Sequence, residues 1–267
     1  MRALEMRGEN ISMRRRQIKI NQNIKRMVRK FLTAAGIVLL AAVFYLAVAK
    51  VYPFNWGVVL RYKSMFLKGL LITFQVSAVS ILISFGLGLV FSIMKTSKIE
   101  FFKDIAAIYV WIFRNTPLLV VILLTYYGVG TIFNLNRFWA AVLALSLFEG
   151  AYMAEIIRSG IEAVDPGEIE AAHSLGMTNS QIFFSIVFPQ AIRISLPPLI
   201  GQMISLVKDS SLASVIALGE LTMMGRQVGT SSFATFESYI VVAFIYIMLT
   251  SVLSVLGRYL ERRMSLA

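Results

Sequence analysis

The residues of this sequence that are best able to do chemistry are ionisable side chains that interrupt apolar stretches. They are Arg114, Glu149, Glu155, Lys208 and Asp209. An ionisable group is costly inside a hydrocarbon environment, so it usually lines a polar passage or pairs with an opposite charge. In the first case these side chains hold the charged groups of a solute. In the second case they pair, as Arg114 with Glu149 or Glu155, and only stabilise helix packing.

A proline close to Arg114 favours the first interpretation, that Arg114 lines a polar passage. Pro117 follows Thr116 in the same apolar stretch, and it lacks the backbone N–H that a continuous helix requires. The membrane interior tolerates broken backbone only against protein or beside a water-filled cavity. We therefore count Thr116 and Pro117 among the candidates for the passage.

Other kinds of reactive site are excluded by the composition. The chain has no cysteine and one histidine, His173, so disulfides, cysteine nucleophiles and multi-histidine metal centres cannot form. No GxxxxGK(S/T) run occurs, so the chain has no phosphate-binding loop of this type. We expect no catalytic residue, metal site or cofactor on this chain. His173 falls in a loop, where we expect it to face solvent or a partner.

The elements that position these residues are transmembrane helices. The 267 residues are 58% hydrophobic and 15% charged, with a mean hydropathy of +0.75. Soluble domains are about 45–50% apolar and about 25% charged. Six spans of roughly 20 residues would occupy about 120 residues, which leaves too few for a large soluble catalytic domain. The composition therefore predicts an all-α, polytopic membrane helix bundle.

The apolar segments predict about six transmembrane helices. We expect the spans at about 31–49, 67–94, 105–128, 138–157, 191–217 and 239–256. Pro117 is expected to break the third span, and Pro197-Pro198 and then Lys208-Asp209 to break the fifth. Residues 50–66 are rich in aromatic side chains, which favour the headgroup level of a bilayer, so we expect an interfacial stretch there.

Basic residues set the predicted orientation. Residues 1–30 contain ten Lys/Arg and two Glu, and so carry +8 of the formal net charge of +12. Basic residues that flank a span mark its cytoplasmic side, which places both termini in the cytoplasm, and this tail also suits anionic membrane lipid. Nucleic-acid binding is disfavoured because the tail has no interleaved aromatic residue. Four basic residues fall on the predicted outer side and so depart from this rule: Lys50, Arg61, Lys63 and Lys68.

The loop between the fourth and fifth spans, at about 158–190, predicts a helical hairpin on the cytoplasmic side. Asp165 suits the N-cap of a first helix, and Glu168 supplies the other half of a capping box. Gly176 suits a left-handed end of that helix. Thr178 can then begin a second helix.

Two interpretations fit this hairpin, whose second helix we expect to end at Pro189. Helix caps and a glycine turn alone describe an amphipathic linker on the membrane equally well. A longer pattern favours a docking element, because the loop resembles the EAA signature of bacterial ABC-importer permeases, EAA-x3-G-x9-I-x-x-P. Its residues here are Glu170, Ala171, Ala172, Gly176, Ile186 and Pro189. Phe188 stands where the family often has leucine.

Five further stretches extend the resemblance to permeases of polar amino acids, of the histidine/glutamine type. They are 68–73, 114–119 (RNTPLL), 150–155 (GAYMAE), 189–198 and 208–212 (KDSSL). Asn115 replaces a glycine of the family pattern, and Ser210 replaces a threonine. The match covers about residues 65–263. Through it, Tyr152 and Ser210 join the candidates for the passage.

The resemblance implies an assembly in the inner membrane of a bacterium. Such permeases pair as homodimers or heterodimers, bind two ATPase subunits that hold ATP and Mg²⁺, and receive substrate from an external amino-acid-binding protein. The EAA residues would dock on the ATPase, whose closure would rock the spans between outward-open and inward-open states. The passage residues would then hold the α-amino and α-carboxylate groups of an amino acid.

This interpretation divides the chain into four parts. They are a basic cytoplasmic tail at 1–30, an extra N-terminal helix with an outer interfacial segment at 31–66, a five-helix permease domain at 67–257 and a cytoplasmic tail at 258–267. The coupling loop, 158–190, lies inside the permease domain.

Two other classes of protein stay open. A gradient-driven secondary transporter or channel would need no docking hairpin, so the EAA pattern favours the importer over it. A membrane-embedded enzyme is disfavoured because His173 lies in a loop and not at the depth of a span.

Overall fold

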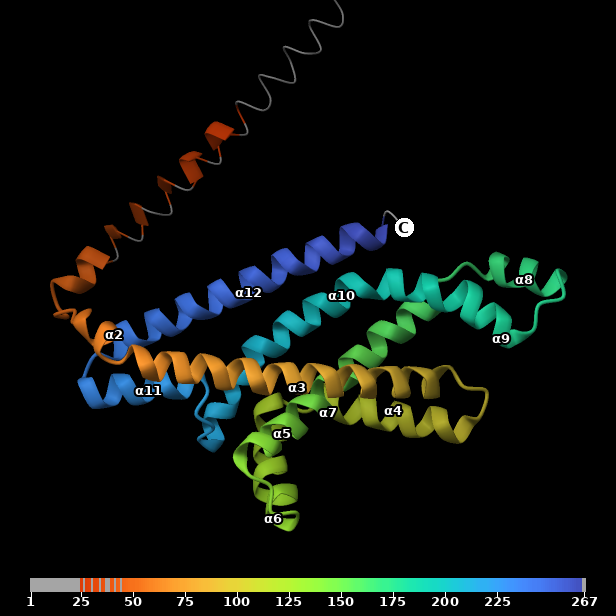
Figure 1. Ribbon diagram of the computed structural model, residues 1–267, viewed down its shortest axis with the longest axis horizontal. Helices are drawn as coiled ribbons and strands as arrows, with labels where there is room; N and C mark the ends of the chain where they lie inside the picture. The colour runs from red at the N-terminus through yellow and green to blue at the C-terminus, as the bar shows by residue number, and fades with distance from the viewer. Residues whose placement is uncertain are drawn as a thin grey trace, which may run out of the picture. The chain divides into compact units, whose positions relative to one another are not determined.

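The computed structural model describes residues 45–265 and, before them, residues 25, 27–29, 31–33, 35–36, 39–40 and 42–43. It divides into two compact units, Met1–Asn55 and Trp56–Ala267. The described residues of the first unit are helical up to Ala49 (Figure 1). Most of the predicted tail 1–30 and part of the predicted span 31–49 lie outside the described residues.

The described part of the second unit is helical and contains no strand, which confirms the predicted all-α class. Its α-helices are α2 (Gly57–Arg61), α3 (Lys63–Thr96), α4 (Glu100–Asn115), α5 (Leu118–Leu124), α6 (Gly130–Ile132), α7 (Arg137–Glu162), α8 (Pro166–Ser174), α9 (Asn179–Ile182), α10 (Phe188–Asp209), α11 (Leu221–Ser232) and α12 (Thr235–Ser265). Short π-helical turns follow α5 and α9, and a 3₁₀ helix follows α10.

Four helical segments of the described residues are long and apolar enough to cross a membrane. They are Lys63–Thr96, Arg137–Glu162, Asn179–Ile216 and Thr235–Arg263. The bent pair Glu100–Asn115 and Leu118–Ile132 makes a fifth if it counts as one span. These segments correspond to the second to sixth predicted spans. The predicted first span lies partly outside the described residues.

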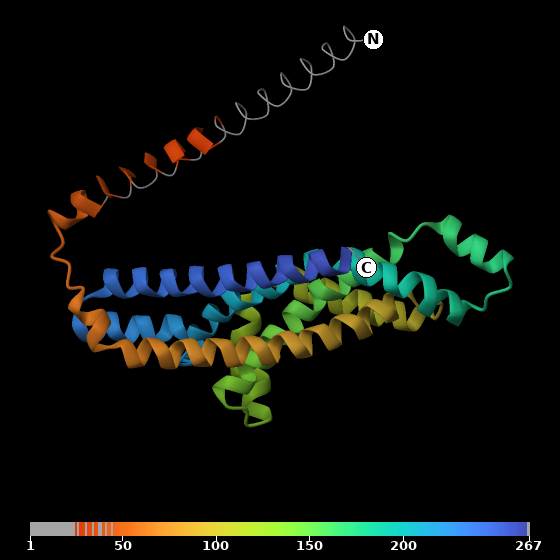
Figure 2. The same ribbon diagram turned by 45° about the horizontal axis from the view of Figure 1, so that its top comes forward.

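Helices α3 and α7 pack against each other (Figures 1 and 2). The buried residues of α3 recur every three or four positions and include Thr73, Ser77, Ser80, Ser84, Gly88 and Ser92. The buried residues of α7 include Ala140, Ala144, Ala151 and Ala154. Small residues let two helix backbones approach closely inside a membrane. This pair forms the centre against which α4 and α10 are placed.

Gly88→Leu is expected to destabilise this helix pair. A Cβ at Gly88 would lie 2.7 Å from the Cβ of Met153 and 3.2 Å from the backbone nitrogen of Ala154. Forced overpacking of this kind costs about 1–3 kcal/mol. The purified variant in detergent should therefore unfold at a lower temperature than the wild type. Gly86→Leu is the matched control, because position 86 has open space around it; equal unfolding temperatures for the two variants would contradict the prediction.

The third span is broken at Pro117, as predicted. Helix α4 ends at Asn115 and α5 begins at Leu118, and the segments Glu100–Asn115 and Leu118–Ile132 are bent by 108° relative to each other. The backbone between them is extended at Thr116. The hydroxyl of Thr116 donates to the backbone carbonyl of Ile112 at 2.8 Å. Side-chain donors of this kind satisfy carbonyl groups that a helix leaves free at its end.

The fifth span differs from the prediction. Pro197-Pro198 does not break it, because α10 runs from Phe188 to Asp209 with both prolines inside. The prolines remove two backbone donors, but contacts with α7 hold the helix together, including a hydrogen bond from the Ser195 hydroxyl to the carbonyl of Ile156. At Lys208-Asp209, where the second break was predicted, the α-helix changes to a 3₁₀ helix, Ser210–Ile216, but the chain stays helical.

Candidate functional site

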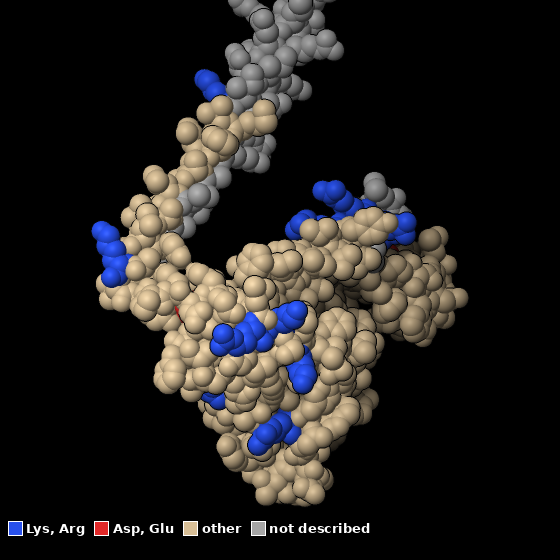
Figure 3. All heavy atoms as spheres, turned by 60° about the vertical axis from the view of Figure 1, so that its left-hand side comes forward, with Lys and Arg blue, Asp and Glu red and all other residues tan. Residues whose placement is uncertain are grey.

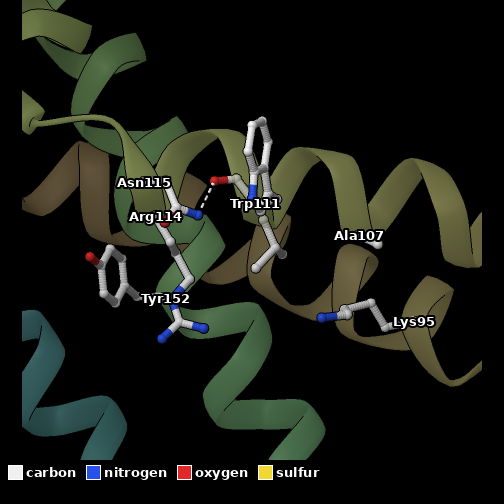
Figure 4. A pocket seen from close by; sticks show the side chains of 7 residues that line it. Lys95, Ala107, Trp111, Arg114, Asn115 and Tyr152 are labelled. Atoms are coloured by element: carbon white, nitrogen blue, oxygen red, sulfur yellow. Dashed lines mark hydrogen bonds between the residues drawn. The ribbon is translucent and has the colours of Figure 1, made fainter.

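Arg114, in the last turn of α4, lies in a hollow between α3, α4 and α7 (Figure 4). The hollow has a volume of about 450 Å³, and Lys95, Trp111, Asn115 and Tyr152 also line it. The Arg114 guanidinium lies 5.2 Å from the centre of the Tyr152 ring, which is a cation–π contact. Figure 4 shows Lys95 of α3 extending toward the side of the hollow where Arg114 lies. Two cationic side chains therefore share one open space.

A second hollow, of about 470 Å³, also has Arg114 in its wall. Its other residues come from α7 and α10 and include Glu155, Ile194 and Pro198. Pro198 has no backbone N–H, so the carbonyl of Ile194 lacks its usual helical donor. Irregular backbone at membrane depth is tolerated beside a cavity. Polar groups of α4, α7 and α10 thus meet around Arg114.

Arg114 forms no ion pair within the described part of the chain. The pairing of Arg114 with Glu149 or Glu155, which the sequence left open, is wrong for this structure. The Glu155 carboxylate instead pairs with Lys95 of α3 and with Arg158, the latter at 2.7 Å between Nη2 and Oε2. The guanidinium of Arg114 is therefore available to an anion that enters the hollow.

Glu149 lines neither of these two hollows. Its side chain is fully buried in α7 and accepts a hydrogen bond from the side-chain amide of Gln202 in α10. Its other oxygen, Oε1, has no hydrogen-bond partner among the described residues. Asp209, at the end of α10, lies close enough to interact electrostatically with Glu149. Two acidic side chains thus meet between α7 and α10.

The remaining candidates for the passage lie either beside Arg114 or near the end of α10. Tyr152, Thr116 and Pro117 lie beside Arg114, through the ring contact or in the break after α4. Lys208 is exposed, whereas Ser210 is buried and donates to the carbonyl of Val207 at 2.7 Å. Neither hollow contains Glu149 or Asp209. Within one chain, Arg114 and Glu155 lie at the hollows, whereas Glu149 and Asp209 meet away from them.

Three residues of these groups were missed by the sequence analysis. Arg158 follows Glu155 by three positions, a spacing that brings side chains together on a helix and could have identified it. Gln202 precedes Asp209 by seven positions, which is about two helical turns, so both lie on one face of α10. Lys95 comes from a different helix, and no sequence spacing could have indicated its contact with Glu155.

The predicted hairpin is present and extends past the end of the bundle at which α12 ends (Figures 1 and 2). The Asp165 carboxylate caps α8 by accepting a hydrogen bond from the backbone of Gly167 at 2.8 Å. Gly176 makes the turn with a φ of +78°, in the left-handed region that favours glycine. Helix α9 begins with a capping box in which Thr178 and Gln181 bind each other's backbone.

Two details of the hairpin differ from the prediction. Glu168 does not complete a capping box with Asp165; its carboxylate accepts a hydrogen bond from the side chain of Gln190. Pro189 does not end the second helix, because α9 passes through a π-helical turn, Phe183–Val187, directly into α10. Pro189 lies directly after this π-helical turn, so the helix continues past a residue that has no backbone N–H to donate.

The hairpin has its own small core and exposes most of the signature residues. Val164, Ala172, Ile182 and Val187 are buried against one another. Glu170, Ala171, Gly176 and Pro189 are exposed, and Ile186 is half-buried. Leu175, beside the turn, is 83% exposed, and His173 is exposed as predicted.

Residues 84–266 match the protein family described as "Binding-protein-dependent transport system inner membrane component". The arginine transport system permease protein ArtQ of Bacillus subtilis is 37% identical over 200 residues, which cover 74% of this chain and 91% of the relative. The probable glutamine ABC transporter permease protein GlnP of the same organism is 40% identical over 201 residues, 73% of this chain and 91% of the relative.

Solved structures agree with these relatives. A chain of an amino acid ABC transporter, crystallised with histidines, is 38% identical and superposes with a TM-score of 0.74. The match covers 79% of this chain and the whole of that chain. A chain of the MetNI methionine ABC transporter in an inward-facing conformation has a TM-score of 0.66 at 20% identity, covering 75% of this chain and 96% of that one, and shares the fold.

Proposed function

Because the chain belongs to the family of binding-protein-dependent inner-membrane transport components, we propose that it is the permease subunit of an ABC importer for a polar amino acid. One observation of the structure carries the proposal: a hairpin with its own core projects from the bundle and exposes its signature residues. The names of the similar permeases, which include arginine and glutamine transporters, support a polar amino acid as the cargo.

The hairpin is the coupling element of this proposal. Glu170, Ala171, Leu175 and Gly176 form an exposed surface around the tip, and they dock in a cleft of a partner ATPase. ATP and Mg²⁺ bind to that partner and not to this chain. Closure of two ATPase subunits moves two hairpins, one in each permease subunit of a homodimer or heterodimer. The spans then rock between outward-open and inward-open states.

The two polar groups of the bundle are the passage of this proposal. The Arg114 guanidinium, which has no carboxylate partner among the described residues, binds the α-carboxylate of the amino acid. Glu149 and Asp209 attract its α-amino group, for which the unpaired Oε1 of Glu149 is an acceptor. Rocking of the spans moves the substrate past Arg114, beside which Tyr152 and Thr116 lie, and past the acidic pair Glu149 and Asp209.

The orientation follows from the hairpin. Because the ATPase is cytoplasmic, the hairpin end of the bundle is the inner side. The basic residues of the N-terminal tail independently favour a cytoplasmic location of both termini. The opposite end receives the amino acid from an external binding protein.

Purification from native membranes in mild detergent tests the proposal first. We expect a P-loop ATPase to accompany the chain, together with a second permease if the dimer is a heterodimer. The purified assembly in liposomes should then accumulate an amino acid only with ATP inside and the binding protein outside. Uptake that needs no ATPase and collapses with the proton gradient would identify a secondary transporter and overturn the proposal.

Glu149→Gln is expected to lower the uptake of the amino acid about 10-fold or more, because a hydrogen bond to a charged group contributes about 1.5–3 kcal/mol. The amide keeps the shape and the contact with Gln202 but replaces a carboxyl oxygen that can accept a hydrogen bond from the α-amino group. Uptake into liposomes measures the effect, and Glu100→Gln is the control, since Glu100 lies at the exposed start of α4 and lines neither hollow. Equal uptake by the two variants would show that Glu149 serves packing only.

A further inference from the structure

Lys95 is a cation of the first hollow to which the proposed passage assigns no role. It stands directly before the last residue of α3, and its side chain is 21% exposed. Apart from Lys95 and Arg114, the residues that line this hollow are uncharged: Ala107, Val110, Trp111, Asn115 and Tyr152. In Figure 4 the ammonium of Lys95 points along the hollow toward Arg114. An anion that enters therefore meets two cations and no carboxylate among the residues that line the hollow.

The carboxylate of Glu155 holds Lys95 from outside this hollow. Glu155 pairs with the Lys95 ammonium, and its Oε2 accepts from Arg158, at 2.9 Å from Nε and 2.7 Å from Nη2. Glu155 lines the second hollow and not the first. An ammonium has three N–H donors, and Glu155 is the only partner of Lys95 in the described part of the chain. Donors of Lys95 therefore remain for a solute in the first hollow.

The acid beside Lys95 is a particular feature of this end of the bundle. The ion pairs of the described residues all use Glu100, Glu155 or Glu162, at the ends of α4 and α7 that adjoin the hairpin. Figure 3 brings the α2 and α11 end forward, and there blue Lys and Arg side chains are spread over the second unit with hardly any red beside them. The fold does not place a carboxylate beside every cation, so Glu155 does more than balance surface charge.

Arg114 and Lys95 lie at different depths of the bundle. A short link joins the end of α3 at Thr96 to the start of α4 at Glu100, so Lys95 and the start of α4 share one side. Arg114 lies in the last turn of α4, a helix of 16 residues that measures about 24 Å at about 1.5 Å per residue. The shared side is cytoplasmic in the proposed orientation. A carboxylate that leaves Arg114 inward therefore approaches Lys95 next.

We propose that Lys95 is a second carboxylate-binding residue of the passage, on its cytoplasmic side, and that Glu155 positions Lys95 and competes with the substrate for it. This inference rests on the proposed function and adds the release step. The α-carboxylate of the amino acid moves from Arg114 to the donors of Lys95 that Glu155 leaves free. Glu155 stays tethered beside Lys95 at a high effective concentration, so it displaces the substrate carboxylate, and the amino acid departs into the cytoplasm.

A purely structural ion pair is the other interpretation of Lys95 and Glu155, and the two interpretations differ in the sign of one effect. If the pair only holds α3 to α7, loss of either partner weakens the same contact and changes substrate binding in the same direction. If Glu155 competes with the substrate, its loss frees Lys95 and tightens binding, whereas loss of Lys95 weakens binding.

Equilibrium binding to the complete purified transporter, without ATP and without the binding protein, distinguishes these interpretations. The probe is the radiolabelled form of whichever standard amino acid wild-type liposomes accumulate. Lys95→Gln is expected to raise the Kd about 10-fold, because a hydrogen bond to a charged group is lost. Glu155→Gln should lower the Kd by about 3-fold or more, because a neutral amide competes less well than a carboxylate for an ammonium. Lys95→Arg keeps the cation and should stay within about 3-fold of the wild type.

Lys103 and Glu100 provide a matched control pair. They form an ion pair in the first turn of α4, at the same end of the bundle, and line neither hollow. Lys103→Gln and Glu100→Gln remove the same two kinds of charge, and both should leave the Kd unchanged.

Opposite shifts of the Kd in Lys95→Gln and Glu155→Gln support the inference. Shifts in the same direction assign the pair to packing and overturn it, and so do unchanged values or a wild type that transports but shows no saturable binding. If wild-type liposomes accumulate no amino acid with ATP inside and the binding protein outside, the proposed function itself fails. That result is distinguishable because it appears in the wild type, before any variant is compared.

Discussion

Gly176→Val is expected to uncouple transport from ATP hydrolysis, with uptake falling about 10- to 100-fold. Gly176 has a φ of +78°, and a β-branched residue there costs about 1–3 kcal/mol of backbone strain. The strain would separate α8 from α9 and displace the exposed tip from the ATPase. The measurements are ATP-driven uptake and co-purification of the ATPase, both of which should fall. Gly86→Val is the control, because position 86 has open space and no positive φ.

A second hairpin variant separates docking from folding of the hairpin. Glu170→Lys reverses an exposed charge whose side chain makes none of the described hydrogen bonds or ion pairs. It should weaken co-purification of the ATPase while the unfolding temperature stays at the wild-type value. Normal uptake in both Gly176→Val and Glu170→Lys would show that the hairpin does not couple the two subunits.

Arg114→Ala is expected to reduce uptake by at least about 10-fold, because a hydrogen bond to a charged group contributes about 1.5–3 kcal/mol. The change removes the one cation shared by the two hollows. Arg114→Lys should recover only part of the uptake, since lysine keeps the charge but not the two-pronged geometry that fits a carboxylate. Co-purification of the ATPase should stay normal in both variants, because Arg114 lies outside the hairpin.

Lys103→Ala provides the control for Arg114. Lys103 is a cation of the same helix, but it pairs locally with Glu100 and lines neither hollow. Its loss should leave uptake unchanged. If Arg114→Ala also transports normally, the guanidinium only packs on the Tyr152 ring, and the passage must be sought elsewhere in the bundle.

The prolines show how far sequence reasoning reaches in this fold. Pro117 and the pair Pro197-Pro198 look alike in the sequence, since each interrupts an apolar stretch. Only Pro117 breaks its helix, where side chains of the preceding turn satisfy the free carbonyls. The pair at 197–198 stays helical because α10 packs on α7 through Ser195 and Leu199. Tertiary packing decides the outcome, and it is not visible in local sequence.

The hairpin was predictable because its signals are local. Its caps, its turn glycine and its apolar spacing all lie within about two dozen residues, and Asp165, Gly176 and Thr178 have the expected places. Glu168 was assigned the wrong partner because Gln190, which it binds instead, lies 22 residues away. The polar groups of the bundle were identified by residue type, but their partners come from other helices, so their grouping required the structure.

The continuity of α9, the π-helical turn and α10 has a mechanical consequence. From Asn179 to Ile216 the backbone is helical without a loop, a length of about 55 Å at about 1.5 Å per residue. No loop separates the hairpin from Gln202 and Asp209, so a displacement of the hairpin by a partner would move the acidic pair with it. The regular hydrogen bonding of this helix is interrupted at two places, the π-helical turn that precedes Pro189 and the pair Pro197-Pro198. The second of these places lies beside the hollow that Arg114 lines.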